Sequence, residues 1–424
     1  MKINVSNQKV AYWYLLTVFT LTFYAVWFWP IPMLHYIGLI VGLVLPIILT
    51  PSFFSQKWFA YFVIYFFVIY LNFVSGDAYF NKSKRIIEEF VALYIPAAML
   101  FYYNKTLDFR WSRTVLFVAI IVLVWTTIST AIIDSQSPGI VRYAHSMMQQ
   151  GLEDVSAFSG FYRMGMSNYI LPHAVPVLIP AFAIVLRDKD LKFKQKLLPI
   201  GILASLMMLL YFGGATGPML IGIAVLIVSF FIKPGSTKGF WGALILVSVI
   251  VLPLLLNDEL MLSLLEWLDD LMGNEGFFHY KVITFQDTIV YGSATGDVEQ
   301  RQGLYAKGIA GFFENILIGS NGDIGGHSVI LNRLGSLGLI GFIPYVAVLV
   351  VLSKKAIKML PANYRVYFYL GSFAAFMMLL SKGIASWELY FFWFVVLPFA
   401  IIYFSNSTKK RIFDGKYNCV QGGI

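Results

Sequence analysis

Cysteine is almost absent from this chain, and charged residues are scarce. The 424 residues include a single cysteine, Cys419, which excludes an intramolecular disulfide framework and a cysteine-based metal site. Only 12% of the residues are charged, against about a quarter in soluble domains, and 59% are hydrophobic. This composition excludes an ordinary soluble protein and indicates a chain that lies in a lipid bilayer.

The motifs of metal-dependent and nucleotide-dependent enzymes are also missing. No group of His, Asp and Glu has the spacing of a metal cage, and there is no Walker phosphate loop. The run from Gly213 to Gly217 is too short for such a loop and follows an apolar span instead of a strand. We therefore expect no metal and no cofactor, and any transfer chemistry would need a donor that is already activated and lipid-linked.

Long apolar runs fill most of the chain. A membrane helix needs about 20 largely apolar residues, and twelve runs approach that length. They lie near residues 11–29, 33–50, 58–74, 87–103, 115–133, 168–186, 197–212, 217–232, 240–256, 334–352, 364–381 and 387–404. The sequence thus predicts an all-α polytopic membrane protein with about 12 transmembrane helices, forming a single integral membrane domain over residues 1–424. The first run is too long for a cleaved signal peptide and is expected to be an anchor.

The basic residues predict the orientation of these spans. The net charge is +9, but the lysines and arginines form short clusters between apolar runs, so nucleic acid is not an expected partner. Placing the N-terminus inside assigns 21 of the 31 Lys and Arg residues to the cytoplasm, as the positive-inside rule favours. We expect cytoplasmic N- and C-termini, a cytoplasmic tail over residues 405–424, and a bacterial plasma (inner) membrane location.

Two predicted outer segments are too long to be simple turns: the extracytoplasmic loop 134–167 and the large extracytoplasmic cap loop 257–333. The cap loop holds 11 of the 22 acidic residues. Apolar residues at helical spacing predict one helix over 261–272 and a second from about Val298 to Leu317, ended by Gly319. Function is expected in these outer loops.

The end of the cap loop contains the first candidate catalytic group. Glycines at 319, 322, 325 and 326 allow close approach of the backbone to a ligand, and His327 follows them. A histidine with a pKa near 6.5 is suited to take a proton from a sugar hydroxyl. The alternative is a turn histidine in a glycine-rich connection.

Basic residues on the predicted outer side form the second group of candidates. Arginine binds phosphate oxygens in a bidentate manner and stays charged when partly desolvated, so Arg142, Arg163 and Arg301 are candidates for a diphosphate ligand. Lys84 and Arg85 are weaker candidates, because Glu88 and Glu89 follow them and neutralisation within this segment is the alternative.

Other ionisable residues carry less weight. His145 and His173 are expected to be structural, and Glu388 is expected to pair with Lys382. The spans themselves are nearly free of ionisable residues. A lipid-linked glycan flippase or transporter would place such residues inside its spans, so this pattern favours an enzyme.

Several short motifs resemble the shared core of O-antigen ligases and Wzy-type polysaccharide polymerases (Wzy_C-like). They are Arg163-Met-Gly165 leading to Asn168, Arg301-x-x-x-Tyr305, Asn315-Ile-Leu-Ile-Gly319, His327-Ser-Val-Ile-Leu331 and Gly335-x-x-Gly338-x-x-Gly341. They cover roughly a fifth of the chain. Two departures are Ala215-Thr216-Gly217-Pro218, where the family often has Ser-Arg, and Ser328, where Asn is commoner.

This resemblance implies a GT-C-like fold and a metal-independent, inverting glycosyl transfer on the outer face of the membrane. The donor and acceptor would be undecaprenyl-diphosphate-linked glycans, surrounded by membrane lipids, with a chain-length regulator and a flippase as further partners. His327 would take the acceptor proton, while Arg163 and Arg301 would hold the diphosphate and stabilise the leaving group. The resemblance favours an O-antigen or capsule polymerase, and the alternative is a ligase that transfers the glycan to lipid A core.

Overall fold

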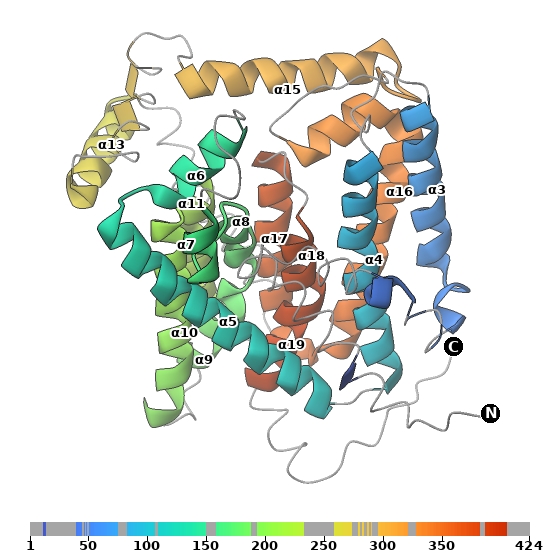
Figure 1. The fold of residues 1–424 in the computed structure, drawn as a ribbon, viewed down its shortest axis with the longest axis horizontal. Helices are drawn as coiled ribbons and strands as arrows, with labels where there is room; N and C mark the ends of the chain where they lie inside the picture. The colour runs from blue at the N-terminus through green and yellow to red at the C-terminus, as the bar shows by residue number, and fades with distance from the viewer. Residues whose placement is uncertain are drawn as a thin grey trace.

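The structure is a computed structural model in which the helices form one bundle (Figure 1). It describes residues 12–13, 40–44, 46, 48, 51–74, 83–106, 109–149, 158–187, 193–232, 258–273, 279, 282–283, 286–287, 290, 296–320, 328–381 and 386–404. Over these ranges the chain forms helices and turns and no strand. The predicted all-α class is therefore confirmed for the described part of the chain.

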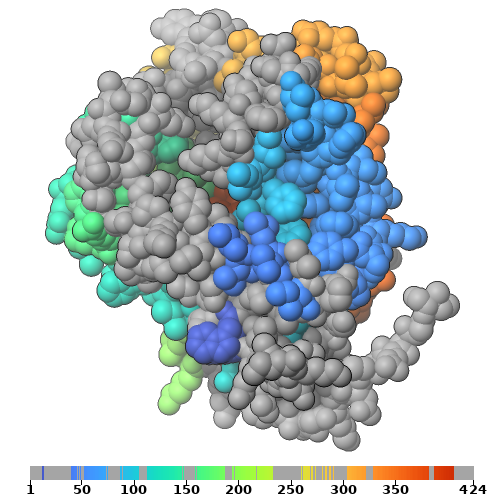
Figure 2. All heavy atoms as spheres, turned by 45° about the vertical axis from the view of Figure 1, so that its right-hand side comes forward, coloured from blue at the N-terminus to red at the C-terminus, as the bar shows by residue number. Residues whose placement is uncertain are grey.

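One side of the bundle is built from three long helices that are far apart in the sequence. They are α3 (Lys57–Val74), which follows the short helix η1 (Pro51–Phe53), α4 (Ser83–Thr106) and α16 (Val329–Met359). Helix α16 packs along α3 and also contacts α4. Figure 2 shows α3 and α4, in blue, on the surface of this side.

The other side contains α5 (Phe109–Gln136), α9 (Ile179–Arg187), α10 (Phe193–Phe212) and α11 (Thr216–Phe231). Between the two sides lie α17 (Arg365–Ser381), α18 (Trp387–Phe391), a π-helical turn η5 (Phe392–Val396) and α19 (Leu397–Phe404). The 3-10 turn η4 (Ala362–Tyr364) leads into α17. Helix α18, the turn η5 and helix α19 are buried almost throughout, whereas α3 exposes apolar side chains such as Phe67 and Leu71. An apolar outer face on a packed bundle suits contact with lipid chains.

Shorter helices lie between the long ones and across one end of the bundle. The cap helices predicted from the sequence are confirmed as α13 (Asp258–Met272) and α15 (Gly296–Glu314). Helix α15 crosses one end of the bundle and packs on α16 (Figure 1). The predicted loop 134–167 contains α6 (Ile140–Gln149) and α7 (Ser159–Arg163), and is followed by α8 (Leu171–Ala174).

A kink in α16 joins the cap to the bundle. Gly338 has φ 56° and ψ −163°, a conformation that is essentially restricted to glycine, and it interrupts the helical hydrogen bonds. The freed amides of Leu339 and Ile340 donate to the carbonyls of Ile316 and Leu317, at 2.9 and 3.0 Å. Backbone groups away from water must be paired, so the segment after α15 completes the hydrogen bonding of the kink.

Gly319 completes the same junction from the cap side. Its φ is 73°, and a side chain added there would overlap the backbone of Gly335, Ser336 and Gly338. The next residue, Ser320, donates its amide to the Gly335 carbonyl at 2.8 Å. The structure thus gives Gly319 a packing role against α16, where the sequence suggested approach to a ligand.

The predicted count of about twelve spans is not reproduced. Within the described residues, three helices are long and apolar enough to cross a membrane: Ser112–Gln136, Val329–Met359 and Trp387–Phe404. Three more apolar helices, Lys57–Asn72, Lys196–Phe212 and Gly217–Phe231, are shorter. The predicted run 168–186 is divided between α8, η3 (Val175–Val177) and α9, because prolines at 172, 176 and 180 interrupt the helical hydrogen bonds. Predicted runs 11–29, 33–50 and 240–256 lie largely or wholly outside the described residues.

Candidate functional site

Helices α6 and α7 are held together by a small apolar core at the end of α5. It is separate from the main core and is formed by Ile133, Ile140, Val141, Ala144, Phe158, Tyr162 and Met166. Burial raises the pKa of Tyr162 to about 12, so its hydroxyl stays protonated at neutral pH. This core places α6, which carries Arg142, beside α7, which carries Arg163. In Figure 1, α6 lies towards the end of the bundle that α15 crosses.

Arg142 belongs to a cluster of rings that we call the Tyr169 cluster, made of Arg142, His145, Tyr169 and His173. The imidazole of His145 stacks on Tyr169 with ring centroids 4.4 Å apart, and the Arg142 guanidinium lies 6.0 Å from the Tyr169 ring centroid. His173 meets the same ring edge-on at 5.0 Å, and its Nδ1 lies 2.9 Å from the Tyr169 carbonyl oxygen. One tyrosine thus brings an arginine and two histidines together.

The turn between α10 and α11 lies against this cluster. A Cβ added to Gly214 would be 3.5 Å from the Cβ of Arg142. This turn belongs to the run from Gly213 to Gly217, which showed no phosphate-loop context in the sequence. The structure nevertheless places it next to an arginine that is suited to phosphate binding.

A buried carboxylate lies near Asn168, the residue before Tyr169. Glu388, in the first turn of α18, is 5% exposed, and α18 packs against α8. The side chains of Ser386 and Asn168 lie near this carboxylate, and its Oε2 atom has no hydrogen-bond partner within the described residues. Asn168 is fixed in turn, because its Oδ1 accepts from the amides of Ile170 and Leu171 at 3.1 and 2.7 Å. A buried carboxylate oxygen without a partner can accept a hydrogen bond from a ligand.

Arg163 ends α7 and is exposed. Within the described part of the chain its guanidinium makes no hydrogen bond or ion pair. Gly165 follows with φ 95° and turns the chain against Trp125 of α5. The packing of α7 thus places Arg163 next to the helix that carries Arg142. The guanidinium N–H groups of Arg163 can therefore donate hydrogen bonds to an anion.

The other predicted site residues are less well described. Arg301 is in α15, and Lys84 and Arg85 are in the first turn of α4, but their side chains are not described. His327 lies outside the described residues, as do Lys382, Gly322, Gly325 and Gly326. The residue after His327 is Ser328, which caps α16 by accepting a hydrogen bond from the Leu331 amide at 3.1 Å.

Sequence reasoning missed a buried ion pair inside the bundle. The guanidinium Nη2 of Arg333, on α16, donates a hydrogen bond to Oε1 of Glu89, on α4, and both side chains are less than 10% exposed. Tyr65 of α3 accepts from Arg333 Nε at 2.6 Å and donates to Glu89 at 3.0 Å. This pair is an exception to the expectation that the spans are nearly free of ionisable residues, because Glu89 lies in the predicted span 87–103. Glu89 pairs with Arg333, while the side chains of Lys84, Arg85 and Glu88 are not described.

Aromatic rings enclose this ion pair. The guanidinium carbon of Arg333 lies 4.4 Å from the centroid of the Tyr345 ring, and the Tyr345 hydroxyl is 2.8 Å from that of Tyr390 on α18. The network joins α3, α4, α16 and α18 on a single arginine. The signal in the sequence was one charge inside the apolar run 87–103 and another directly before the run 334–352, but nothing in either segment identified the other as its partner.

Comparison with known proteins yields no relative: no family model matches the chain, and neither the curated proteins nor the solved structures include a significant match. Within the described residues, no group of three or more His, Cys, Asp or Glu is arranged to hold a metal ion.

Proposed function

We propose that this protein is a polymerase of undecaprenyl-diphosphate-linked oligosaccharide repeat units, acting at the outer face of a bacterial plasma membrane. The observation that carries the proposal is Arg163, which is exposed and has no ion pair among the described residues, on a helix packed beside Arg142 and its histidine-bearing ring cluster. The apolar outer face of α3 and the three apolar helices long enough to span a bilayer support a membrane-embedded substrate. The resemblance of the Arg163, Arg301 and His327 motifs to polymerases and ligases supports the reaction class.

In this proposal the arginines hold the donor diphosphate. An acceptor hydroxyl oxygen attacks the anomeric carbon of the donor sugar from the side opposite the diphosphate, which inverts that centre. The carbon–oxygen bond to the diphosphate breaks, and the lipid diphosphate leaves with the electron pair. His327 takes the hydroxyl proton, and Arg163 and Arg301 stabilise the charge that develops on the leaving phosphate.

The test is a reconstituted reaction with purified full-length protein and a lipid-linked repeat unit. The wild-type protein is expected to produce a ladder of lengthened glycans, and Arg163→Ala and His327→Ala are expected to abolish it. Arg113→Ala is the matched control, because Arg113 is also an exposed arginine but lies at the other end of α5. A ladder that Arg163→Ala and His327→Ala leave undiminished would reject the assigned roles.

The same assay separates the polymerase from its two alternatives. A ligase would extend lipid A core oligosaccharide once and would form no ladder from repeat units alone. A flippase would move the lipid-linked unit across vesicles without changing its length. The buried Arg333–Glu89 pair is the kind of intramembrane charge found in transporters, but both partners are satisfied within the bundle. This arrangement suits a structural brace better than a transport pathway.

A further inference from the structure

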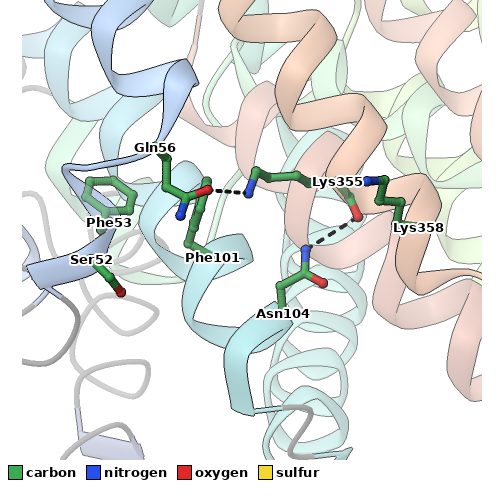
Figure 3. Close-up of a pocket in the computed structure, with 7 residues that line it drawn as sticks. All are labelled: Ser52, Phe53, Gln56, Phe101, Asn104, Lys355 and Lys358. Carbon is green, nitrogen blue, oxygen red and sulfur yellow. Dashed lines mark hydrogen bonds between the residues drawn. The ribbon is translucent and has the colours of Figure 1, made fainter. Parts of the chain in front are cut away.

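A cavity lies between the ends of α3, α4 and α16, far from the α15 junction. It has a volume of about 350 Å³, and Figure 3 shows the residues that line it. These are Ser52, Phe53, Gln56, Phe101, Asn104, Lys355 and Lys358. The two lysines are in the last turns of α16, whereas α15 packs on the first half of that helix, so the cavity is at the opposite end of the bundle. Its volume is within the usual range for small ligands.

The lining combines positive charge with polar donors. Lys355 and Lys358 are three residues apart on α16, so they lie on one face of the helix, where like charges repel. The Lys355 ammonium lies 3.6 Å from the centroid of the Phe101 ring and donates one hydrogen bond to Oε1 of Gln56, at 3.1 Å. An ammonium has three donors, and among the described residues only one of them has a hydrogen-bond acceptor. No carboxylate is among the described lining residues.

Other groups hold these lysines in place. The amide of Asn104 donates to the backbone carbonyl of Lys355 at 3.5 Å, which ties the end of α4 to α16 (Figure 3). Phe53 and Phe101 give the cavity an apolar wall, with ring centroids 5.3 Å apart. A cavity with two cations and no carboxylate among its described lining residues, an apolar wall and a position at the end of a membrane bundle matches a phosphate group that is carried on an apolar molecule.

We propose that this cavity binds a phosphate group, and that the phosphate belongs to the head group of an anionic phospholipid in the adjacent leaflet. The lysines would bind the phosphate oxygens, and the wall formed by Phe53 and Phe101 would contact the glycerol and the upper acyl chains. The soluble alternative is a free phosphate monoester. This site is separate from the proposed glycan chemistry and does not depend on it.

The experiment uses the full-length protein, purified in a neutral detergent and titrated with short-chain phosphatidylglycerol while its melting temperature is followed. Phosphatidylglycerol is expected to raise the melting temperature, and phosphatidylcholine, which has no net charge, is expected to leave it unchanged. Glycerol 3-phosphate tests the alternative that the ligand is a soluble phosphate monoester. If it stabilises as strongly as phosphatidylglycerol, the cavity is a phosphate site but the lipid assignment is overturned.

Variants assign the effect to the cavity. Lys355→Gln combined with Lys358→Gln is expected to weaken the apparent affinity for phosphatidylglycerol by about 25-fold, since each lysine near a membrane surface contributes about fivefold. Lys354→Gln is the matched control, because Lys354 is exposed on the same turn but does not line the cavity. Replacement of both lysines by arginine is expected to preserve binding.

Two further outcomes would overturn the proposal. One is equal stabilisation by phosphatidylglycerol and phosphatidylcholine, which needs no variant to detect. The other is an equal loss of affinity in Lys354→Gln and in the double variant, which would indicate a general effect of surface charge. If the double variant fails to fold, Lys358→Gln alone is informative. Lys358 is exposed, so its replacement should not prevent folding. The single variant is expected to weaken binding by about fivefold.

Discussion

Removal of Arg333 tests the buried network that joins α3, α4, α16 and α18. Arg333→Met would leave the Glu89 carboxylate, which is 7% exposed, without its cation. It would also remove the Nε–H group that donates a hydrogen bond to the Tyr65 hydroxyl. Breaking one side of a buried ion pair costs about 3–5 kcal/mol, because an uncompensated charge stays buried. The single variant should therefore melt well below the wild type, or fail to fold.

Replacing both partners gives the informative comparison. Glu89→Leu combined with Arg333→Met removes both charges, and such replacements are often neutral or stabilising by about 1–4 kcal/mol. The double variant is therefore expected to be more stable than Arg333→Met alone, with a coupling free energy well above the 0.5 kcal/mol found for independent sites.

The assay is thermal unfolding in a single detergent, followed by tryptophan fluorescence, because Trp58 and Trp393 are buried in the bundle. Arg113→Met is the control, since replacing an exposed arginine should change stability by less than about 0.5 kcal/mol. Additive effects of the two substitutions, or an unchanged melting temperature for Arg333→Met, would refute the assignment of a buried, coupled pair.

Three further predictions concern the junction and the candidate site. Gly338→Ala is expected to prevent stable folding, because the φ and ψ of Gly338 suit only glycine and an added Cβ would overlap the Leu317 backbone. Gly303→Ala is the control, because Gly303 faces open space on α15. In thermal unfolding this control should be neutral or stabilising by about 0.5–1 kcal/mol. Glu388→Gln should keep or raise the melting temperature, because an amide is less costly to bury than a carboxylate, but should reduce glycan polymerisation; full activity would exclude a role for that carboxylate. Arg142→Ala should weaken the apparent affinity for the lipid diphosphate by roughly tenfold or more, as expected for a hydrogen bond to a charged group, and an unchanged KM in the ladder assay would contradict this.

The candidate site was only partly visible in the sequence. Arg142 and Arg163 were recognised because arginines are unusual on the predicted outer side, and α6 and α7 pack together through one small core. His145, Tyr169 and Glu388 gave no such signal, because a ring or a carboxylate becomes informative only when its neighbours are known. The lysine cavity was equally hidden, since Lys355 and Lys358 belong to one of the short basic clusters between apolar runs, and such clusters are typical of membrane proteins in general.

The sequence by itself determined that the chain is helical and apolar, and where most of the long helices and both cap helices lie. These properties are local, because the spacing of apolar residues along a helix is set within a few turns. The structure decided that Gly319 and Gly338 form a backbone junction and that Arg333 is buried with Glu89, although 244 positions separate them. It also decided that, within the described residues, three helices are long and apolar enough to span a bilayer. Pairings of this kind depend on which helix faces meet, and a linear pattern of hydrophobicity does not encode that choice.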